Sequence, residues 1–145
     1  MKEKFYPFEA SEDYLFFWFE SQSEQRKIVK MVELTKVAEN IYNLAFGDMD
    51  EKGVLDDLVV SNNGDMRKTL ATVVQVIVTF FGAYPDKQLY FTGSSPARTR
   101  LYRVILSREA ENWNEVFDIT GILGGETFPF QNSIAYEGFM ISRKT

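Results

Sequence analysis

The hydrophobic and polar positions in the first third of the chain predict three β-strands. Residues 14–19 form a continuous apolar and aromatic run that is too short for a typical helix. Residues 27–37 are rich in Val, Ile and Thr, and residues 40–46 carry a large apolar side chain at every second position. Polar turns near 21–24 and 38–40 would join the three strands into an antiparallel meander.

The pattern then changes to that of a buried helix. The Ser, Asn, Gly and Asp cluster at residues 61–65 is typical of a loop that caps a helix. We expect the helix to run from about residue 65 to residue 81, because Gly82 and Pro85 follow it. On a helical wheel nearly every position is apolar except for one narrow polar stripe, formed by Lys68, Thr72, Gln75 and Thr79.

A strand at residues 88–92 and a second helix follow. Ser95 before Pro96 is a well-defined start signal, because serine caps a helix and proline is favoured at its first position. This helix should reach at least Ser107. A continuation, or a separate short helix, would carry residues 113–117.

The remaining segments complete an α+β pattern. Residues 54–60 could form a short extended piece, residues 119–130 a loop or short hairpin, and residues 134–141 a closing strand. The order is three strands, a helix, a strand, a helix and a strand. We therefore predict an antiparallel or mixed sheet that starts with a three-stranded meander and has two main helices packed on one face. A chain of 145 residues fits a single domain, residues 1–145.

Composition removes several kinds of chemistry. The chain has no histidine and no cysteine, which excludes a Ser-His-Asp triad, a thiol nucleophile, a disulfide and the usual zinc ligands. Carboxylates, Lys, Arg, Tyr, hydroxyls and backbone amides remain. They form no motif of a known reaction, so we predict neither a catalytic residue nor a cofactor, and whether the protein is an enzyme stays open.

Charge and hydropathy restrict the partners. The chain has 16 basic and 21 acidic residues, a net charge of −5, which argues against general nucleic-acid binding. The N-terminus lacks the apolar core of a signal peptide, and no stretch approaches the roughly 20 apolar residues of a membrane helix. We therefore expect a cytoplasmic protein.

The two predicted helix starts suggest an anion site. If both helices run antiparallel to the strand at residues 88–92, their N-termini lie at the same end of the sheet. The loops at 61–65 and 93–95 then become neighbours. Each helix start offers unpaired amide groups and the positive end of a dipole, which attract an anion.

Two arginines strengthen this prediction. On the wheel Arg98 falls within the buried arc of the second helix, and Arg67 falls between Val74 and Val78 on the first helix. A cation in the first turn of a helix opposes the dipole, and on a buried arc it is also partly desolvated. Arg100 and Arg103, by contrast, share the solvent face with Ser107. The buried arc of the second helix is expected to comprise Ala97, Leu101, Val104 and Ile105.

Two explanations account for these arginines. They could pair within the chain with nearby carboxylates, namely Asp48, Asp56, Asp57 or Asp65. Alternatively, a phosphate or carboxylate of a ligand could bind between the helix starts, with Asp57 and Asp65 as charge partners of the arginines. The candidate ligand-binding residues are Asn62, Asn63, Arg67, Ser94, Ser95, Arg98 and Tyr102. The same aspartates are a poor metal site, because adjacent aspartates rarely point the same way, and we predict no metal.

Other functions stay open beside a non-catalytic anion-binding protein. The chain could be an interaction or accessory component that uses exposed aromatics or the stripe of Arg100 and Arg103. Such a component could form a homodimer. The chain could also be an enzyme acting on a phosphorylated or nucleotide substrate. In that case Asp57 or Asp65 would serve as base or metal ligand, and Arg98 would stabilise charge.

Four segments carry a resemblance to a known family. They are Tyr42 to Asp48 (YNLAFGD), Ser61 to Asp65 (SNNGD), Gly93 to Ser95 (GSS) and Arg98 to Arg103 (RTRLYR). Together they resemble a family of short, uncharacterised bacterial proteins, found mainly in Bacteroidota, over nearly the whole chain. The resemblance implies a small cytoplasmic single-domain protein, and it implies no activity, substrate or catalytic residue.

Overall fold

The computed structural model describes residues 4–24, 26–56, 65–92, 96–113, 115–131 and 134–144. The chain divides into two compact units. The first unit comprises Met1–Leu34 and Ala45–Ala83, and the second comprises Thr35–Leu44 and Tyr84–Thr145. Strands β3 (Lys27–Ala38) and β4 (Ile41–Met49) contribute residues to both units. The single domain predicted from chain length stays a prediction.

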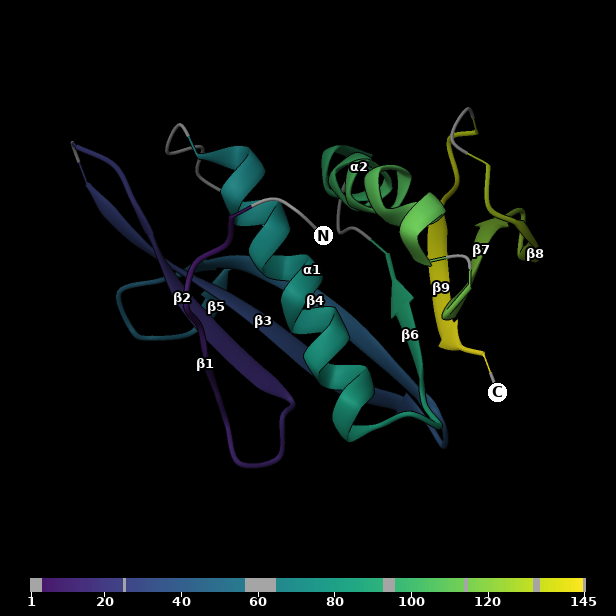
Figure 1. Cartoon of the computed structure of the whole chain (residues 1–145), viewed down its shortest axis with the longest axis horizontal. Helices are drawn as coiled ribbons and strands as arrows, with labels where there is room; N and C mark the ends of the chain where they lie inside the picture. The colour runs from purple at the N-terminus through teal and green to yellow at the C-terminus, as the bar shows by residue number, and fades with distance from the viewer. Residues whose placement is uncertain are drawn as a thin grey trace. The chain divides into compact units, whose positions relative to one another are not determined.

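The first unit contains the predicted meander (Figure 1). Strand β2 (Phe16–Gln22) pairs antiparallel with β3, whose other neighbour is β4. These three strands confirm the ones predicted from the hydrophobic pattern. Two short strands were not predicted as such: β1 (Glu9–Ala10) pairs with β2, and β5 (Leu55–Asp56) pairs with β4.

Helix α1 (Met66–Ala83) supplies the apolar cover of the first unit. The register of β2 and β3 places Phe17 opposite Val32 and Phe19 opposite Lys30, so these four side chains share one face of the sheet. All four are buried. Because α1 is apolar over most of its circumference, it buries ten of its residues, among them Val73, Ile77 and Phe80. The bounds predicted for this helix agree with α1 to within two residues.

The predicted polar stripe of α1 is only partly correct. Lys68, Gln75 and Thr79 are half-buried, but Thr72 is fully buried. The wheel could not anticipate this burial because the N-terminal segment covers Thr72, and the Tyr6 amide donates a hydrogen bond to its hydroxyl (2.9 Å). The exposed side of α1 instead includes Val78 and Gly82.

By length and composition α1 could also cross a membrane, which corrects the expectation that no stretch comes close. However, 56% of its 18-residue window is buried inside the protein. The core helix of a folded domain meets the same criterion, so we assign α1 to the core.

The second unit contains a mixed sheet. The first residues of β4 pair in parallel with β6 (Gln88–Phe91), and β6 pairs antiparallel with β9 (Gly138–Arg143). Strand β9 also pairs with β7 (Phe117–Leu123), which forms a hairpin with β8 (Glu126–Pro129). The predicted α+β class and the mixed sheet are therefore confirmed, although the strand order is more complex than predicted.

Helix α2 (Pro96–Trp113) begins at the predicted proline and packs on the strands of the second unit. The ring of Tyr102 meets the edge of Phe91 in β6 (5.5 Å between centroids), and Trp113 meets Phe117 in β7 (5.2 Å). The helix continues to Trp113, whereas Phe117 belongs to a strand. The described buried residues of α2 are Tyr102, Ile105, Leu106, Glu109 and Trp113.

This buried arc agrees with the predicted one at Ile105 and differs from it at Val104, whereas the side chains of Ala97 and Leu101 lie outside the described residues. Val104 was expected to be buried, but 39% of it is exposed. The aromatic contacts at Tyr102 and Trp113 hold their side of the helix against the sheet. The packing of both helices on one face concerns both units together and stays a prediction.

The end of the chain forms a hairpin and a closing strand. Gly124 and Gly125 connect β7 to β8 with φ values of 62° and 80°, conformations that a two-residue hairpin turn needs and that glycine adopts without strain. The closing strand begins at Gly138 and not at residue 134. The residues before Gly138 do not pair as a strand. Tyr136 instead packs its ring against Gly121, and its hydroxyl donates a hydrogen bond to the Pro129 carbonyl (3.1 Å).

The contact between Gly121 and Tyr136 gives a test of this packing. A Cβ at residue 121 would lie 2.3 Å from the nearest ring atom of Tyr136. We expect Gly121→Ala to lower the free energy of unfolding by about 2–4 kcal/mol, because the buried ring must move. Urea denaturation measures this change. The matched control is Gly82→Ala, where a Cβ meets nothing within 4 Å; it should be neutral or stabilising by up to about 1 kcal/mol. Equal effects of the two substitutions would contradict the packing.

Candidate functional site

Most buried polar side chains of the described residues belong to the first unit. They are Ser21 on β2, Lys30 on β3, Asp48 on β4, and Thr69 and Thr72 on α1. Lys30 pairs with Phe19 across β2 and β3, and Ser21 pairs with Ile28, so Lys30 and Ser21 are diagonal neighbours on the face that packs against α1. We call these five residues, together with Tyr6 and Asp65, the polar core of the first unit.

Asp65 connects three segments of this polar core. It directly precedes α1, and its carbonyl accepts the amide of Thr69 (2.9 Å). Its Oδ2 accepts two hydroxyl hydrogen bonds, from Ser21 on β2 and from Tyr6 in the N-terminal segment, both at 2.5 Å. The start of α1 therefore already has a carboxylate of the chain itself, held by two donors.

These contacts shift the pKa values of the Asp65 carboxyl and the Tyr6 phenol. Burial raises the pKa of the Asp65 carboxyl, but the hydrogen bonds from Ser21 and Tyr6 stabilise the carboxylate more, and the net pKa is lowered. The pKa of the Tyr6 phenol is raised, first by burial and then by its hydrogen bond to the Asp65 anion. Near neutral pH the arrangement is thus a neutral phenol on an ionised carboxylate.

Tyr6 attaches the N-terminal segment to α1 and β2. Its ring stacks on Phe19 (6.0 Å, 19° between planes), and the ammonium of Lys68 lies 4.2 Å from the ring centroid. Its amide bonds Thr72, and its hydroxyl accepts the amide of Gln22 (3.1 Å). Only 6% of Tyr6 is exposed, whereas its neighbours Phe5 and Pro7 are exposed.

Lys30 and Asp48 form a buried ion pair. The Lys30 Nζ donates to Asp48 Oδ1 at 2.7 Å, and the two side chains are only 1% and 9% exposed. Asp48 also lies opposite Asp56 in the register of β4 and β5. Asp48 thus has a lysine partner within the chain. Among the described residues, no group of three or more His, Cys, Asp or Glu residues could hold a metal ion.

The structure describes only part of the predicted anion site. Asn62, Asn63, Ser94, Ser95 and Asp57 lie outside the described residues, as does the side chain of Arg98, whose backbone belongs to α2. Of the candidate residues with described side chains, Arg67 is exposed and Tyr102 is buried (2% exposed). Whether these residues contact a ligand stays a prediction.

The expectation of a partly desolvated Arg67 is wrong. Its side chain is exposed. Of its two neighbours on the wheel, Val78 is exposed and Val74 is buried, so Arg67 lies on the solvent side of the boundary between them. On α2, Arg100 is exposed and Arg103 is half-exposed, in agreement with their predicted solvent face.

Four residues of the polar core (Tyr6, Ser21, Lys30 and Thr69), and one on α2, were missed by sequence reasoning. Lys30 follows the same alternation as Ile28, Val32 and Leu34, a signal that could have placed it on the buried face. Tyr6 and Ser21 have no comparable local signal. Glu109 is 5% exposed, and its Oε1 has no hydrogen-bond partner in the described part of the chain.

Removing the charge of Lys30 tests the buried ion pair. We expect Lys30→Met to lower the free energy of unfolding by about 3–5 kcal/mol, because Asp48 keeps a buried charge without its ammonium. The double substitution Lys30→Met with Asp48→Leu should recover most of this loss. Urea denaturation measures both. The control on the same strand is Lys27→Met, whose exposed ammonium lies 4.0 Å from Glu20 and should contribute about 0–1 kcal/mol. A loss no larger than that of the control would show that Lys30 and Asp48 are not desolvated.

The hydrogen bond of Tyr6 to Asp65 predicts a pH dependence. Asp65 has a lowered pKa in the folded protein, so its contribution is present above its unfolded pKa and is lost as pH falls through the folded value. Tyr6 has a raised pKa, so its contribution is lost as pH rises through the folded value. We expect Tyr6→Phe to cost about 1–2 kcal/mol between roughly pH 5 and 9, and less at about pH 3 and above about pH 11. Denaturation of both proteins across this range measures the difference, and a constant difference would contradict the assignment.

Comparison with known proteins places the chain in a family without assigning an activity. No curated protein and no solved structure gave a match. One family model matches residues 2–144, which is nearly the whole chain. The chain therefore belongs to the family of unknown function DUF6934.

Proposed function

We propose that this protein binds a small anionic ligand, carrying a phosphate or carboxylate group, at the start of α2 through Ser94, Ser95 and Arg98. The observation that carries the proposal is a local excess of positive charge. Residues 84–108, all in the second unit, contain five basic residues and one acidic residue, a net charge of +4, although the whole chain has −5. Between Lys87 and Arg108 the sequence contains no acidic residue at all.

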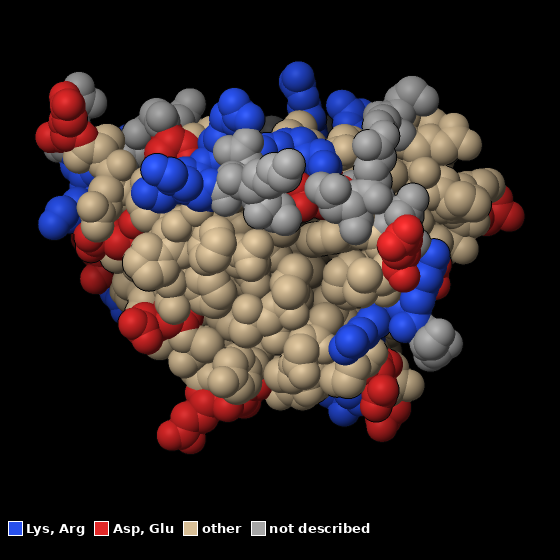
Figure 2. Space-filling view, in the orientation of Figure 1, with Lys and Arg blue, Asp and Glu red and all other residues tan. Residues whose placement is uncertain are grey.

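The described part of α2 supports this positive surface. Arg100 is exposed and Arg103 is half-exposed, and Figure 2 shows Lys and Arg side chains over α2. The first turn of α2 contains no acidic residue. A helix start is the positive end of the dipole, and arginines beside it add to the attraction for an anion.

The start of α1 is a weaker candidate. Asp65 places a carboxylate of the chain next to this helix start, and Ser21 and Tyr6 hold it in the ionised form. A ligand anion there would be repelled by that carboxylate. Asn62, Asn63 and Arg67 are therefore secondary candidates, and Tyr102 could contribute only through its hydroxyl, because its ring packs on Phe91.

The same contacts argue against Asp65 as the base of an enzyme. A carboxylate with a lowered pKa that accepts two hydroxyl hydrogen bonds is a weak proton acceptor near neutral pH. We therefore favour a binding function over the enzymatic alternative on a phosphorylated substrate. An interaction component that uses Arg100 and Arg103 stays the second alternative, and it predicts a partner protein or a dimer in place of a small ligand.

Binding of inorganic phosphate and pyrophosphate tests the proposal. We expect both to raise the melting temperature at low ionic strength, and added salt to weaken the effect. Arg98→Gln should weaken pyrophosphate binding at least about tenfold in calorimetry, a loss of about 1.4 kcal/mol. The matched control is Arg143→Gln, an exposed arginine on β9 in the same unit, which should bind as the wild type does. Equal losses in both variants, or no binding by the wild type, would overturn the proposal.

A further inference from the structure

The N-terminal segment, residues 4–8, is attached to the first unit in an unusual way. Figure 1 shows this segment, in purple, leaving β1 and running beside the first turns of α1. Lys4, Phe5 and Pro7 are exposed, and Phe8 is half-buried. Tyr6 alone is buried, at 6% exposed. Tyr6 is therefore the main anchor of the segment, and the ring of Phe8 adds an edge contact with Phe17 (6.0 Å between centroids).

The contacts of Tyr6 involve residues far along the chain and no strand ladder. Its amide bonds the Thr72 hydroxyl, and its own hydroxyl bonds Asp65 Oδ2. Strand pairing begins only at Glu9, opposite Trp18. The Tyr6 hydroxyl also contacts the Gln22 backbone at the end of β2, and Phe8 contacts Phe17. Since no backbone ladder holds residues 4–8, breaking these side-chain contacts can release the segment while the pairing of β1 with β2 and the helix α1 stay intact.

We propose that residues 4–8 form a strap that opens and closes over the first turns of α1, with Tyr6 as its latch, and that opening uncovers the Asp65 carboxylate and the Thr72 hydroxyl. The Thr72 hydroxyl keeps its hydrogen bond to the Lys68 carbonyl (2.7 Å) in the open state. The strap covers groups that are themselves chemically competent. When Tyr6 leaves, Asp65 loses one of its two hydroxyl donors and keeps the one from Ser21. The face of Phe19 and the ammonium of Lys68 lose the Tyr6 ring. The exposed surface then combines an aromatic ring, a carboxylate, a hydroxyl and an ammonium, the set that now recognises a phenol.

The latch is electrostatic as well as apolar. The groups that face the Tyr6 side chain are the Asp65 carboxylate, the Ser21 hydroxyl, the Gln22 backbone and the Lys68 ammonium. Protonation of Asp65 at acidic pH weakens the hydrogen bond from Tyr6, and ionisation of Tyr6 at alkaline pH places two anions together. The strap is therefore most firmly closed between these two limits.

Amide hydrogen exchange followed by NMR tests the strap directly. The Tyr6 amide is protected by Thr72, whereas the Ile77 amide lies in the fully buried middle of α1. If the strap opens by itself, Tyr6 exchanges faster than Ile77 by a factor on the order of a hundred, with little dependence on urea. If Tyr6 exchanges at the rate of Ile77 and with the same urea dependence, the segment opens only on global unfolding and the proposal is overturned.

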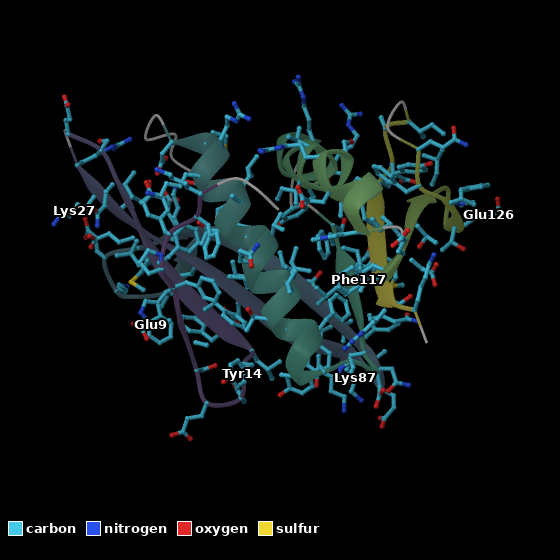
Figure 3. The ribbon with its side chains drawn as sticks, in the orientation of Figure 1. Glu9, Tyr14, Lys27, Lys87, Phe117 and Glu126 are labelled. Carbon is cyan, nitrogen blue, oxygen red and sulfur yellow. The ribbon has the colours of Figure 1, made fainter. Side chains whose placement is uncertain are left out.

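Two variants separate the latch from general stability. Tyr6→Phe should raise the exchange rate of the residue-6 amide at least about tenfold, corresponding to a hydrogen bond of about 1.4 kcal/mol. The matched control is Tyr14→Phe, a half-exposed tyrosine at the turn between β1 and β2 (Figure 3). It should leave this rate unchanged. The same acceleration in both variants would contradict a specific latch.

Chemical complementation identifies what the opened surface recognises. In Tyr6→Ala, p-cresol should restore part of the lost melting temperature, whereas toluene, which has the ring but no hydroxyl, should restore less. Equal rescue by both compounds would show that Asp65 does not select the hydroxyl and would overturn the latch. If Tyr6→Ala does not fold, the exchange measurements on the wild type and Tyr6→Phe decide the question by themselves.

Discussion

The burial of charge beneath α1 is the constraint on which the first unit depends. Lys30 and Asp48 lie on inward faces of neighbouring strands, where water cannot solvate them, so each needs the other at 2.7 Å. Asp65 meets the same requirement with the hydroxyls of Ser21 and Tyr6. The Lys30–Asp48 pair joins β3 to β4, whereas the contacts of Asp65 hold the start of α1. A hydrogen-bonded charge tolerates little displacement, whereas aliphatic contacts can repack, so these polar contacts restrict the packing more specifically than apolar side chains do.

The strands and helices that were predicted correctly are specified by local sequence signals. Alternation in β3 and β4, the polar segments between strands, and Ser95 before Pro96 each act within a few residues, and the elements they predict are present. The failures have a different origin. Thr72 is buried by Tyr6, 66 residues away, and Val104 is exposed on a helix whose other side is held by distant aromatic contacts. A helical wheel contains no information about which neighbours will cover it.

The candidate site was predictable to a similar extent. Alternation could have placed Lys30 on the inward face of its strand, but the predicted strand at residues 40–46 ends before Asp48, so the partner of Lys30 could not be predicted. The role of Tyr6 could not, because residues 4–8 have no periodicity and the acceptor of the phenol lies 59 residues away. Arg67 was predicted to be partly buried but is exposed. Its position on the wheel lies at the boundary between the buried Val74 and the exposed Val78, so a small rotation of the helix decides its burial.

The absence of histidine and cysteine gives these assignments a wider meaning. Without imidazole and thiol, a general base would have to be a carboxylate, a lysine or a tyrosine. Of the four aspartates considered near the helix starts, two are engaged in contacts within the chain. Asp48 is bound to Lys30, and Asp65 is held by two hydroxyls that lower its pKa. The arginines of α2 have no acidic neighbour along the sequence before Glu109. These contacts support the proposed anion binding over proton abstraction by Asp48 or Asp65. In the proposed open state of the strap, Asp65 would lose the hydrogen bond from Tyr6, which would raise its pKa and its basicity.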